Sequence, residues 1–150
     1  MTVLRARGFS LVELAAAMLV LGLLFAFSVP AFQSVSASYQ LKGATQNIAA
    51  ELRLAREKAI ATGTEQPMHF TYNWAGCGGC DYHVHYASGV ATTWKLPSGV
   101  TYYSVAFGGV AGPTMTKDGR ASTSGDIILQ NQRGARDTVS VQMSGLVLTR

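Results

Sequence analysis

An unbroken apolar run near the start of the chain is its clearest pattern. Residues 9–29 read FSLVELAAAMLVLGLLFAFSV, and Glu13 is the only charged residue among them. A helix of this length is about 30 Å long, which matches the hydrocarbon core of a bilayer. Arg5 and Arg7 precede the run, and the next basic residue is Lys42. Because the basic flank of a membrane helix stays in the cytoplasm, we expect the C-terminal part to be exported.

An amphipathic helix is expected to continue the apolar run. Apolar residues recur at helical spacing on one face, and charged residues occupy the opposite face. The helix should end near Thr62, with Gly63 as its C-terminal stop. Core packing against a globular head explains the apolar stripe. The stripe consists of Leu41, Ile48, Leu52, Ala55 and Ala59.

From residue 67 the period of apolar residues changes to two, which predicts β-strands. Met68 and Phe70, for example, flank His69. Strands are expected over residues 68–72, 82–86, 92–96, 100–105, 126–130, 138–143 and 146–148. Glycine-containing turn signals separate them. A long helix followed by six to eight short antiparallel strands indicates an α+β fold, with the helix packed on an antiparallel sheet.

Composition narrows the class of protein. The chain has 150 residues, of which 48% are hydrophobic and 13% charged, so intrinsic disorder is excluded. A net charge of +4 does not favour nucleic acid as the partner. The sequence contains no GxSxG, Walker or HExxH motif, so we expect neither an enzyme nor a cofactor. The glycine-rich residues 106–112 are expected to form a flexible surface loop.

Glu13 is the residue that a simple membrane anchor does not explain. A carboxylate inside a membrane helix costs about 2.5–3.5 kcal/mol on insertion scales, so it requires a partner. The helix N-terminus offers one explanation, because its dipole favours an anion. A cleaved secretory signal, with a cut near Ser28, is an alternative for the whole segment. Against it, Glu13 interrupts the apolar core and the helical pattern continues past Pro30.

Residues 7–14, Arg-Gly-Phe-Ser-Leu-Val-Glu-Leu, resemble the type III signal of type IV pilins and type II secretion pseudopilins. The resemblance implies that a membrane-embedded prepilin peptidase cuts between Gly8 and Phe9, and that the new Phe9 amine is methylated. It also implies that Glu13 pairs with the N-terminal amine of a neighbouring subunit. Gly22 and Pro30 fall where pilins often carry helix-breaking residues, and Pro30 is expected to bend the helix.

The C-terminal third resembles the GspH/FimT family of minor pilins and minor pseudopilins. The similarity lies in residues 126–129, the loop at 133–137, residues 139–141 and Gly145 before a last strand. The resemblance implies a leader at 1–8, a transmembrane and filament-core helix at 9–32, its amphipathic continuation at 33–62 and a periplasmic β-rich head at 63–150. It further implies a single-pass protein of the bacterial inner membrane.

Type II secretion is the function that this resemblance favours, with a type IV minor pilin as the alternative. Either subunit would assemble with other pilins or pseudopilins through an inner-membrane assembly platform. Some relatives take up DNA with a tail that resembles Gly-Arg-x-Arg, but here Leu146 occupies the first arginine position. Arg133, Arg136 and Arg150 remain candidates for a small DNA-binding patch. Three cations would bind DNA weakly and in a salt-dependent manner.

Cys77 and Cys80 form a CxxC pair in a glycine-rich segment. In an exported domain such a pair is most simply a local disulfide, worth about 2 kcal/mol by chain entropy. Together with His83 and His85 the two cysteines also make a candidate metal set, although the spacing matches no recurrent zinc pattern. A membrane-anchored exported binding module, which could bind a metal, is therefore the alternative from another functional class.

Overall fold

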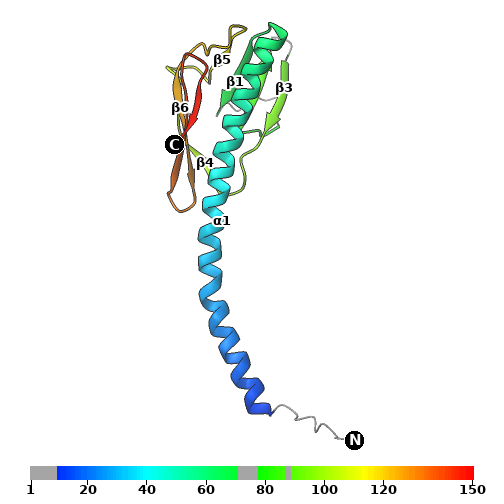
Figure 1. Ribbon diagram of the computed structural model, residues 1–150, viewed down its shortest axis with the longest axis vertical. Coiled ribbons are helices and arrows are strands. Elements are labelled where there is room, and N and C mark those ends of the chain that lie inside the picture. Colours follow the sequence, from blue (N-terminus) through cyan, green and yellow to red (C-terminus); the bar gives the residue numbers. More distant parts are fainter. Residues whose placement is uncertain (1–9, 71–77, 87–88) are drawn as a thin grey trace, which may run out of the picture. The chain divides into compact units, whose positions relative to one another are not determined.

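The computed structural model describes residues 10–70, 78–86 and 89–150. The chain divides into two compact units, Met1–Ser36 and Ala37–Arg150. The helix α1, Leu11–Thr62, runs through 52 residues and belongs to both units (Figure 1). All strands of the described chain lie in the second unit, which we call the head.

Both ends of α1 carry recognisable stop signals. Ser10 caps the N-terminus, because the Glu13 amide donates a hydrogen bond to Ser10 Oγ at 3.2 Å. At the other end Gly63 has φ 65°, a left-handed conformation that glycine adopts without steric cost and that closes helices. The predicted end at Thr62 is confirmed.

The second half of α1 supplies the centre of the head. The five residues of the predicted stripe are all buried, and Ile48, Leu52 and Ala59 are fully so. The stripe is wider than the sequence suggested, since Ala44 and Ala49 are also buried. These residues share one hydrophobic core with buried residues of both sheets.

The first sheet has strand order β3-β2-β1-β5. Its members are β1 (Gln66–Phe70), β2 (Tyr82–Tyr86), β3 (Gly89–Trp94) and β5 (Thr114–Met115). Met68 and Phe70 face the core, and Met68 is paired with Val84. Aromatic rings stack along this inner face, with Tyr82 5.2 Å from Trp94 and 5.7 Å from Phe70 between ring centroids. Offset aromatic pairs of this kind add to simple burial.

The second sheet has strand order β4-β6-β7-β8 and is antiparallel throughout. Its members are β4 (Val100–Ala106), β6 (Gly125–Asn131), β7 (Arg136–Val141) and β8 (Val147–Thr149). Ile127, Leu129 and Val139 are fully buried and alternate with more exposed neighbours. In Figure 1 the green strands β1 and β3 appear on either side of the cyan-to-green half of α1, and the orange-to-red strands of the second sheet lie to its left. The predicted α+β fold with a long helix on antiparallel sheets is confirmed.

The glycine-rich segment at 106–112 corrects one expectation. The sequence predicted a flexible surface loop, but Phe107 is 1% exposed and stacks 6.2 Å from Phe70. Gly112 is buried against the Met68 carbonyl, where a Cβ atom would collide with the backbone. The loop therefore closes the core beside β1, to which Ala111 and Pro113 offer their carbonyls. Phe107, a large apolar ring within a stretch of glycines and small apolar residues, was the signal that the sequence analysis missed.

Candidate functional site

Glu13 lies in the first turn of α1 and is exposed. It occupies the third helical position after the Ser10 cap, the place of the acidic residue in a capping box. Helix-end electrostatics therefore explains why the helix tolerates the carboxylate. Glu13 belongs to the Met1–Ser36 unit, where nothing buries its side chain. Gly8 and Phe9, the predicted cleavage and methylation positions, lie outside the described residues.

The apolar side chains that follow Glu13 are exposed around the whole helix. Leu11 is 84% exposed, Phe25 68% and Phe27 75%. An 18-residue window of α1 is long and apolar enough to cross a membrane, and none of it is buried within the chain. Exposed apolar surface of this extent marks a membrane or protein contact, because water disfavours it. A single-pass anchor is consistent with this segment.

Gly22 and Pro30, the predicted helix-breaking positions, both lie inside α1. The helix is assigned without interruption through both of them, so neither residue ends it. A Cβ atom at Gly22 would meet nothing within 4 Å. The surface of the helix at Gly22 therefore has room for a side chain. A bend at Pro30 stays a prediction.

The three histidines of the chain form one cluster in the head. His69 of β1 lies directly opposite His83 of β2, and their ring centroids are 5.3 Å apart. His85 lies 5.4 Å from His69 and 6.1 Å from His83. His83 is only 1% exposed. Sequence periodicity singled out His83 and His85, but His69 joins them only through the β1–β2 register.

Cys80 lies beside this histidine cluster. It is disulfide-bonded, and no free cysteine occurs among the described residues. Its Sγ atom is 3.7 Å from His83 Nδ1. Cys77, the other half of the predicted pair, lies outside the described residues. Among the described residues no group of three or more His, Cys, Asp or Glu is arranged to hold a metal ion.

Burial and mutual repulsion lower the pKa of two histidines of this cluster. Desolvation is the main cause that lowers the pKa of His69 below 6.5, and the charges of His83 and His85 lower it further. Burial also lowers the pKa of His83, again with a contribution from His85. At neutral pH His69 and His83 are therefore uncharged, the state in which a histidine can ligate a metal.

The three arginines proposed for DNA binding lie at one end of the second sheet. Arg133 lies in the β6–β7 turn, Arg136 begins β7, and Arg150 exchanges backbone hydrogen bonds with Thr138. The Arg136 guanidinium stacks over the Tyr103 ring at 3.4 Å from its centroid, a cation–π contact. The grouping is compatible with a small basic patch, although the Arg136 guanidinium already stacks on the Tyr103 ring.

Asn131 positions the β6–β7 turn and was not singled out from the sequence. Its buried side-chain oxygen accepts hydrogen bonds from the Arg133 and Ala135 amides, each at 3.0 Å. Its amide nitrogen donates to the Ala37 carbonyl of α1 at 3.4 Å. An Asn before a glycine-containing turn is a weak sequence signal, and only the tertiary contact with α1 distinguishes it.

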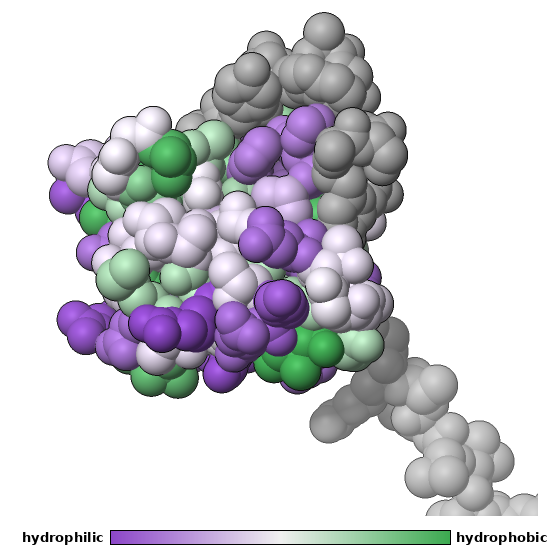
Figure 2. Space-filling view, turned by 90° about the horizontal axis from the view of Figure 1, so that it is seen from above, coloured by the Kyte–Doolittle hydropathy of each residue, from purple (hydrophilic) through white to green (hydrophobic). Residues whose placement is uncertain are grey.

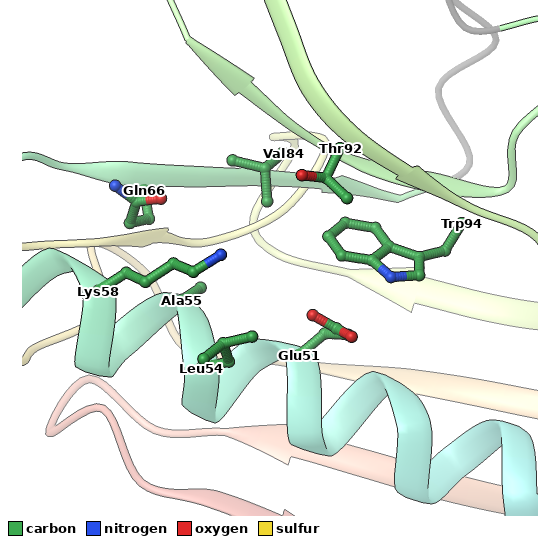
Figure 3. Close-up of a pocket in the computed structure, with 8 residues that line it drawn as sticks. All are labelled: Glu51, Leu54, Ala55, Lys58, Gln66, Val84, Thr92 and Trp94. Carbon is green, nitrogen blue, oxygen red and sulfur yellow. The ribbon is translucent and has the colours of Figure 1, made fainter.

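Two hollows on the head are too small to suggest a small-molecule site. One, of about 20 Å³, lies between α1 and the first sheet, where Figure 3 shows Glu51 and Lys58 reaching from α1 toward Thr92 and Trp94. That volume is about enough for one water molecule. The other, of about 230 Å³, is lined by Arg53, Arg56, Glu57, Ile60, Gly145, Leu146 and Val147.

The larger hollow lies where arginines of α1 donate hydrogen bonds to backbone carbonyls of the head. Arg56 Nε donates to the Gly119 carbonyl at 2.7 Å, and an Arg53 guanidinium nitrogen donates to the Val147 carbonyl at 3.0 Å. Ligand sites usually enclose about 300–1,000 Å³. The head face seen in Figure 2 is mostly white and purple, with green confined to separate spots. This face lacks the continuous apolar surface that the first half of α1 has.

Comparison with known proteins identifies the fold. No protein-family model and no curated protein matches the chain. Two solved structures of the minor pseudopilin EpsH from the type II secretion system of Vibrio cholerae do match. The first is 14% identical with a TM-score of 0.55, and the match covers 74% of this chain and 96% of EpsH. The second is 15% identical with a TM-score of 0.53, covering 73% and 92%.

The chain has a pseudopilin fold. The match spans nearly all of the EpsH chains, so it includes the arrangement of helix and sheets and not one shared motif. The fold predicted from the type III signal and the C-terminal strands is thereby confirmed. At this low identity the likeness concerns architecture, and the role of individual residues is argued below as a proposal.

Proposed function

We propose that this chain is a minor pseudopilin subunit of a type II protein secretion system and assembles into the pseudopilus through its N-terminal helix. The observation that carries the proposal is the combination, in one chain, of a head with the EpsH fold and an apolar helix segment left fully exposed. Such a helix requires apolar surroundings, and both a bilayer and a filament core offer them. The role is that of a structural subunit and involves no catalysis or cofactor.

Assembly begins, in this proposal, with removal of residues 1–8. Prepilin peptidase cuts between Gly8 and Phe9 in the inner membrane, and the freed Phe9 amine is methylated. The cut removes Arg5 and Arg7 and leaves a cationic terminus beside the first helical turn. The head then lies in the periplasm, in agreement with the positive-inside rule for the uncut chain.

Glu13 supplies the register between subunits. An exposed carboxylate in the first helical turn, surrounded by apolar side chains, is costly in lipid. Pairing with the Phe9 amine of a neighbouring subunit would offset that cost for both charges, since opposite charges attract strongly at low dielectric. A subunit therefore gains stability by leaving the bilayer for the filament, where the inner-membrane platform adds it to other pseudopilins.

A type IV minor pilin of the FimT kind is the second candidate. The grouping of Arg133, Arg136 and Arg150 at one end of the second sheet favours it, because such a patch could contact DNA. Leu146, at a position where DNA-binding relatives carry arginine, and the Arg136–Tyr103 stacking argue for secretion instead. Measured DNA affinity that falls steeply with salt, and falls further in Arg133→Ala, would favour the pilus role.

Intact mass of the protein extracted from membranes tests the first step. The expected mass lacks residues 1–8 and carries one methyl group on Phe9. A retained leader, or a cut near Ser28, would reject the pilin-type pathway and favour a simple anchor or a secreted binding module.

Replacement of Glu13 tests the second step. In Glu13→Ala we expect normal processing, while cross-linking to other pseudopilins and secretion of folded exoproteins decrease by at least about tenfold, as expected when a buried charge loses its partner. Glu57→Ala, an exposed carboxylate on the second half of α1, is the matched control and should assemble normally. Normal assembly of the Glu13→Ala variant would refute the pairing while leaving the pseudopilin fold intact.

A further inference from the structure

The larger hollow of the head combines positive charge with exposed apolar side chains. Arg53 and Arg56, three residues apart on one face of α1, form its basic side. Ile60 of α1 and Leu146 of the β7–β8 turn form its apolar side, and they are 53% and 45% exposed. Hollows too small for a small molecule commonly receive anchor side chains in protein interfaces. The assembly through the first half of α1 proposed above uses none of these four residues.

The two arginines of the hollow are held in place by neutral partners. Arg53 donates to the Val147 carbonyl at 3.0 Å, and Arg56 donates to the Gly119 carbonyl at 2.7 Å. Within the described parts of the chain neither guanidinium pairs with a carboxylate. A guanidinium has five N–H donors, so each arginine retains donors and a full charge for a further acceptor. Glu57 is the one acidic residue in the lining, which therefore has a net positive charge.

The surroundings of the hollow add to its positive charge. The turn that contains Gly119 contributes Lys117, Asp118 and Arg120, which together carry one further positive charge. Residues 37–150 contain ten basic and seven acidic residues, so the head has a net charge of +3. A second copy of the head carries the same charge and is repelled, whereas an acidic segment is attracted. Charge complementarity therefore favours an acidic partner that differs from this chain.

The strand β8 has an open edge beside the hollow. It is the last strand of the second sheet, and no further strand of the described chain pairs with it. Arg150 exchanges backbone hydrogen bonds with Thr138, so Val147 and Thr149 direct their backbone N–H and C=O groups away from β7. The hydrogen bond from Arg53 to the Val147 carbonyl agrees with this direction. Thr149 is exposed, so an extended chain can pair with its backbone.

We propose that the hollow and the open edge of β8 bind an extended, acidic segment of a different pseudopilin subunit. The segment pairs with the backbone of Thr149, and one of its carboxylates accepts hydrogen bonds from Arg53. A neighbouring apolar side chain of the segment covers Ile60 and Leu146. The inference rests on the pseudopilin function proposed above and adds the face of the head that meets the next subunit. The head then selects the neighbour, while the apolar half of α1 provides attachment that is common to all subunits.

Photo-cross-linking with the full chain, in cells that assemble the secretion system, tests this inference. Benzoylphenylalanine replaces Leu146 in one variant and Phe25, in the apolar half of α1, in another. From position 146 we expect a cross-link to a different pseudopilin, at a peptide that contains Asp or Glu. A cross-link from position 146 to a second copy, to an exoprotein or to a peptide without a carboxylate would overturn the proposal. Cross-links to pseudopilins from position 25 alone would also overturn it but leave the pseudopilin function standing. The absence of such cross-links from both positions would contradict both.

Charge reversal at Arg53 tests what selects the segment. In Arg53→Glu the yield of the cross-link from position 146 should decrease by at least about tenfold, because like charges then meet across the interface. Lys58→Glu makes the same change of charge at the small hollow beside the first sheet, and it should keep the yield. Arg53→Gln retains a donor for the Val147 carbonyl but lacks the charge, so it should also lose cross-linking. Unchanged far-UV circular dichroism of the purified variants confirms that each is folded. Equal yields in Arg53→Glu and Lys58→Glu would show that charge does not select the segment, and the assignment would be wrong.

Discussion

Residues 11–36 and residues 37–62 belong to one α-helix, yet their side chains have opposite surroundings. In the first segment apolar residues are exposed on every side, as at Leu24, 59% exposed, and Phe27, 75%. In the second segment Ile48, Leu52 and Ala59 are fully buried between two sheets. The first segment therefore finds no apolar contacts within the chain, whereas the second obtains them there.

The two segments of this helix therefore have different patterns of apolar and polar residues. The second segment is amphipathic, because the chain itself supplies the partner for one face and water faces the other. The first segment has no such asymmetry, as expected if lipid or a filament surrounds it, which is the proposed role of this segment. Substitutions that are equivalent in chemistry should thus have very different effects on the stability of the head.

The largest expected effect comes from truncating one leucine in each segment. Leu52→Ala should destabilise the head by about 2–5 kcal/mol, because it removes buried methyl groups and leaves a cavity. Leu24→Ala should change the same free energy of unfolding by less than about 0.5 kcal/mol, since its side chain contacts no core. Urea unfolding in micelles, followed by near-ultraviolet circular dichroism of the stacked Tyr82 and Trp94, measures both. Similar losses in the two variants would show that the segments are not independent.

Local patterns in the sequence were sufficient for the elements themselves. The apolar stripe predicted the buried face of α1, and Gly63 predicted its C-terminal end. The alternation at residues 82–86 predicted the whole of β2. Each of these signals comes from neighbours in sequence, where spacing fixes which side of an element a residue faces. The strand β5, only two residues long, was missed because no periodicity can appear in Thr114 and Met115.

Contacts between segments that are far apart in sequence could not be predicted from such local patterns. His69 meets His83 only because β1 and β2 pair in one particular register, and a shift by one residue would place it on the core face. Asn131 is important because its side chain reaches Ala37 of α1, 94 residues earlier in the chain. Phe107 was assigned to a surface loop, since nothing nearby in sequence indicates that Phe70 covers it. Residues of the candidate sites are therefore less predictable than the fold.

Alkaline pH should affect the head and leave the first segment unchanged. Burial, with the nearby Asp81 charge and Tyr82, raises the pKa of Tyr102 far above its usual 10.0, and its hydroxyl donates to the Asp81 carbonyl at 3.2 Å. Burial and the charges of Glu51 and Asp81 likewise raise the pKa of Tyr82 to about 12. Above pH 10 the unfolded state loses these protons first, so stability is full below about pH 10 and decreases as the pH rises toward the folded pKa values.

For Tyr102 alone the expected loss is about 1 kcal/mol per pH unit above 10. Tyr102→Phe should flatten the alkaline slope of the free energy of unfolding, whereas Tyr103→Phe, at an exposed position, should keep it. Residues 10–36 contain no tyrosine, so the helicity of the first segment should stay constant over the same range. An unchanged slope in Tyr102→Phe would assign the alkaline transition to another group.

The smallest expected effect is confined to the first turn of α1. Ser10→Ala removes the acceptor for the Glu13 amide, and loss of such a cap costs about 1 kcal/mol. Amide hydrogen exchange at residues 11–14 should accelerate by about fivefold, while the head exchanges as before. Ser28→Ala is the control, because Ser28 Oγ donates to the Leu24 carbonyl inside the helix and caps neither end. Faster exchange at Leu52 in the Ser10→Ala variant would mean that fraying spreads along α1, and that the head does not hold its own half of the helix independently.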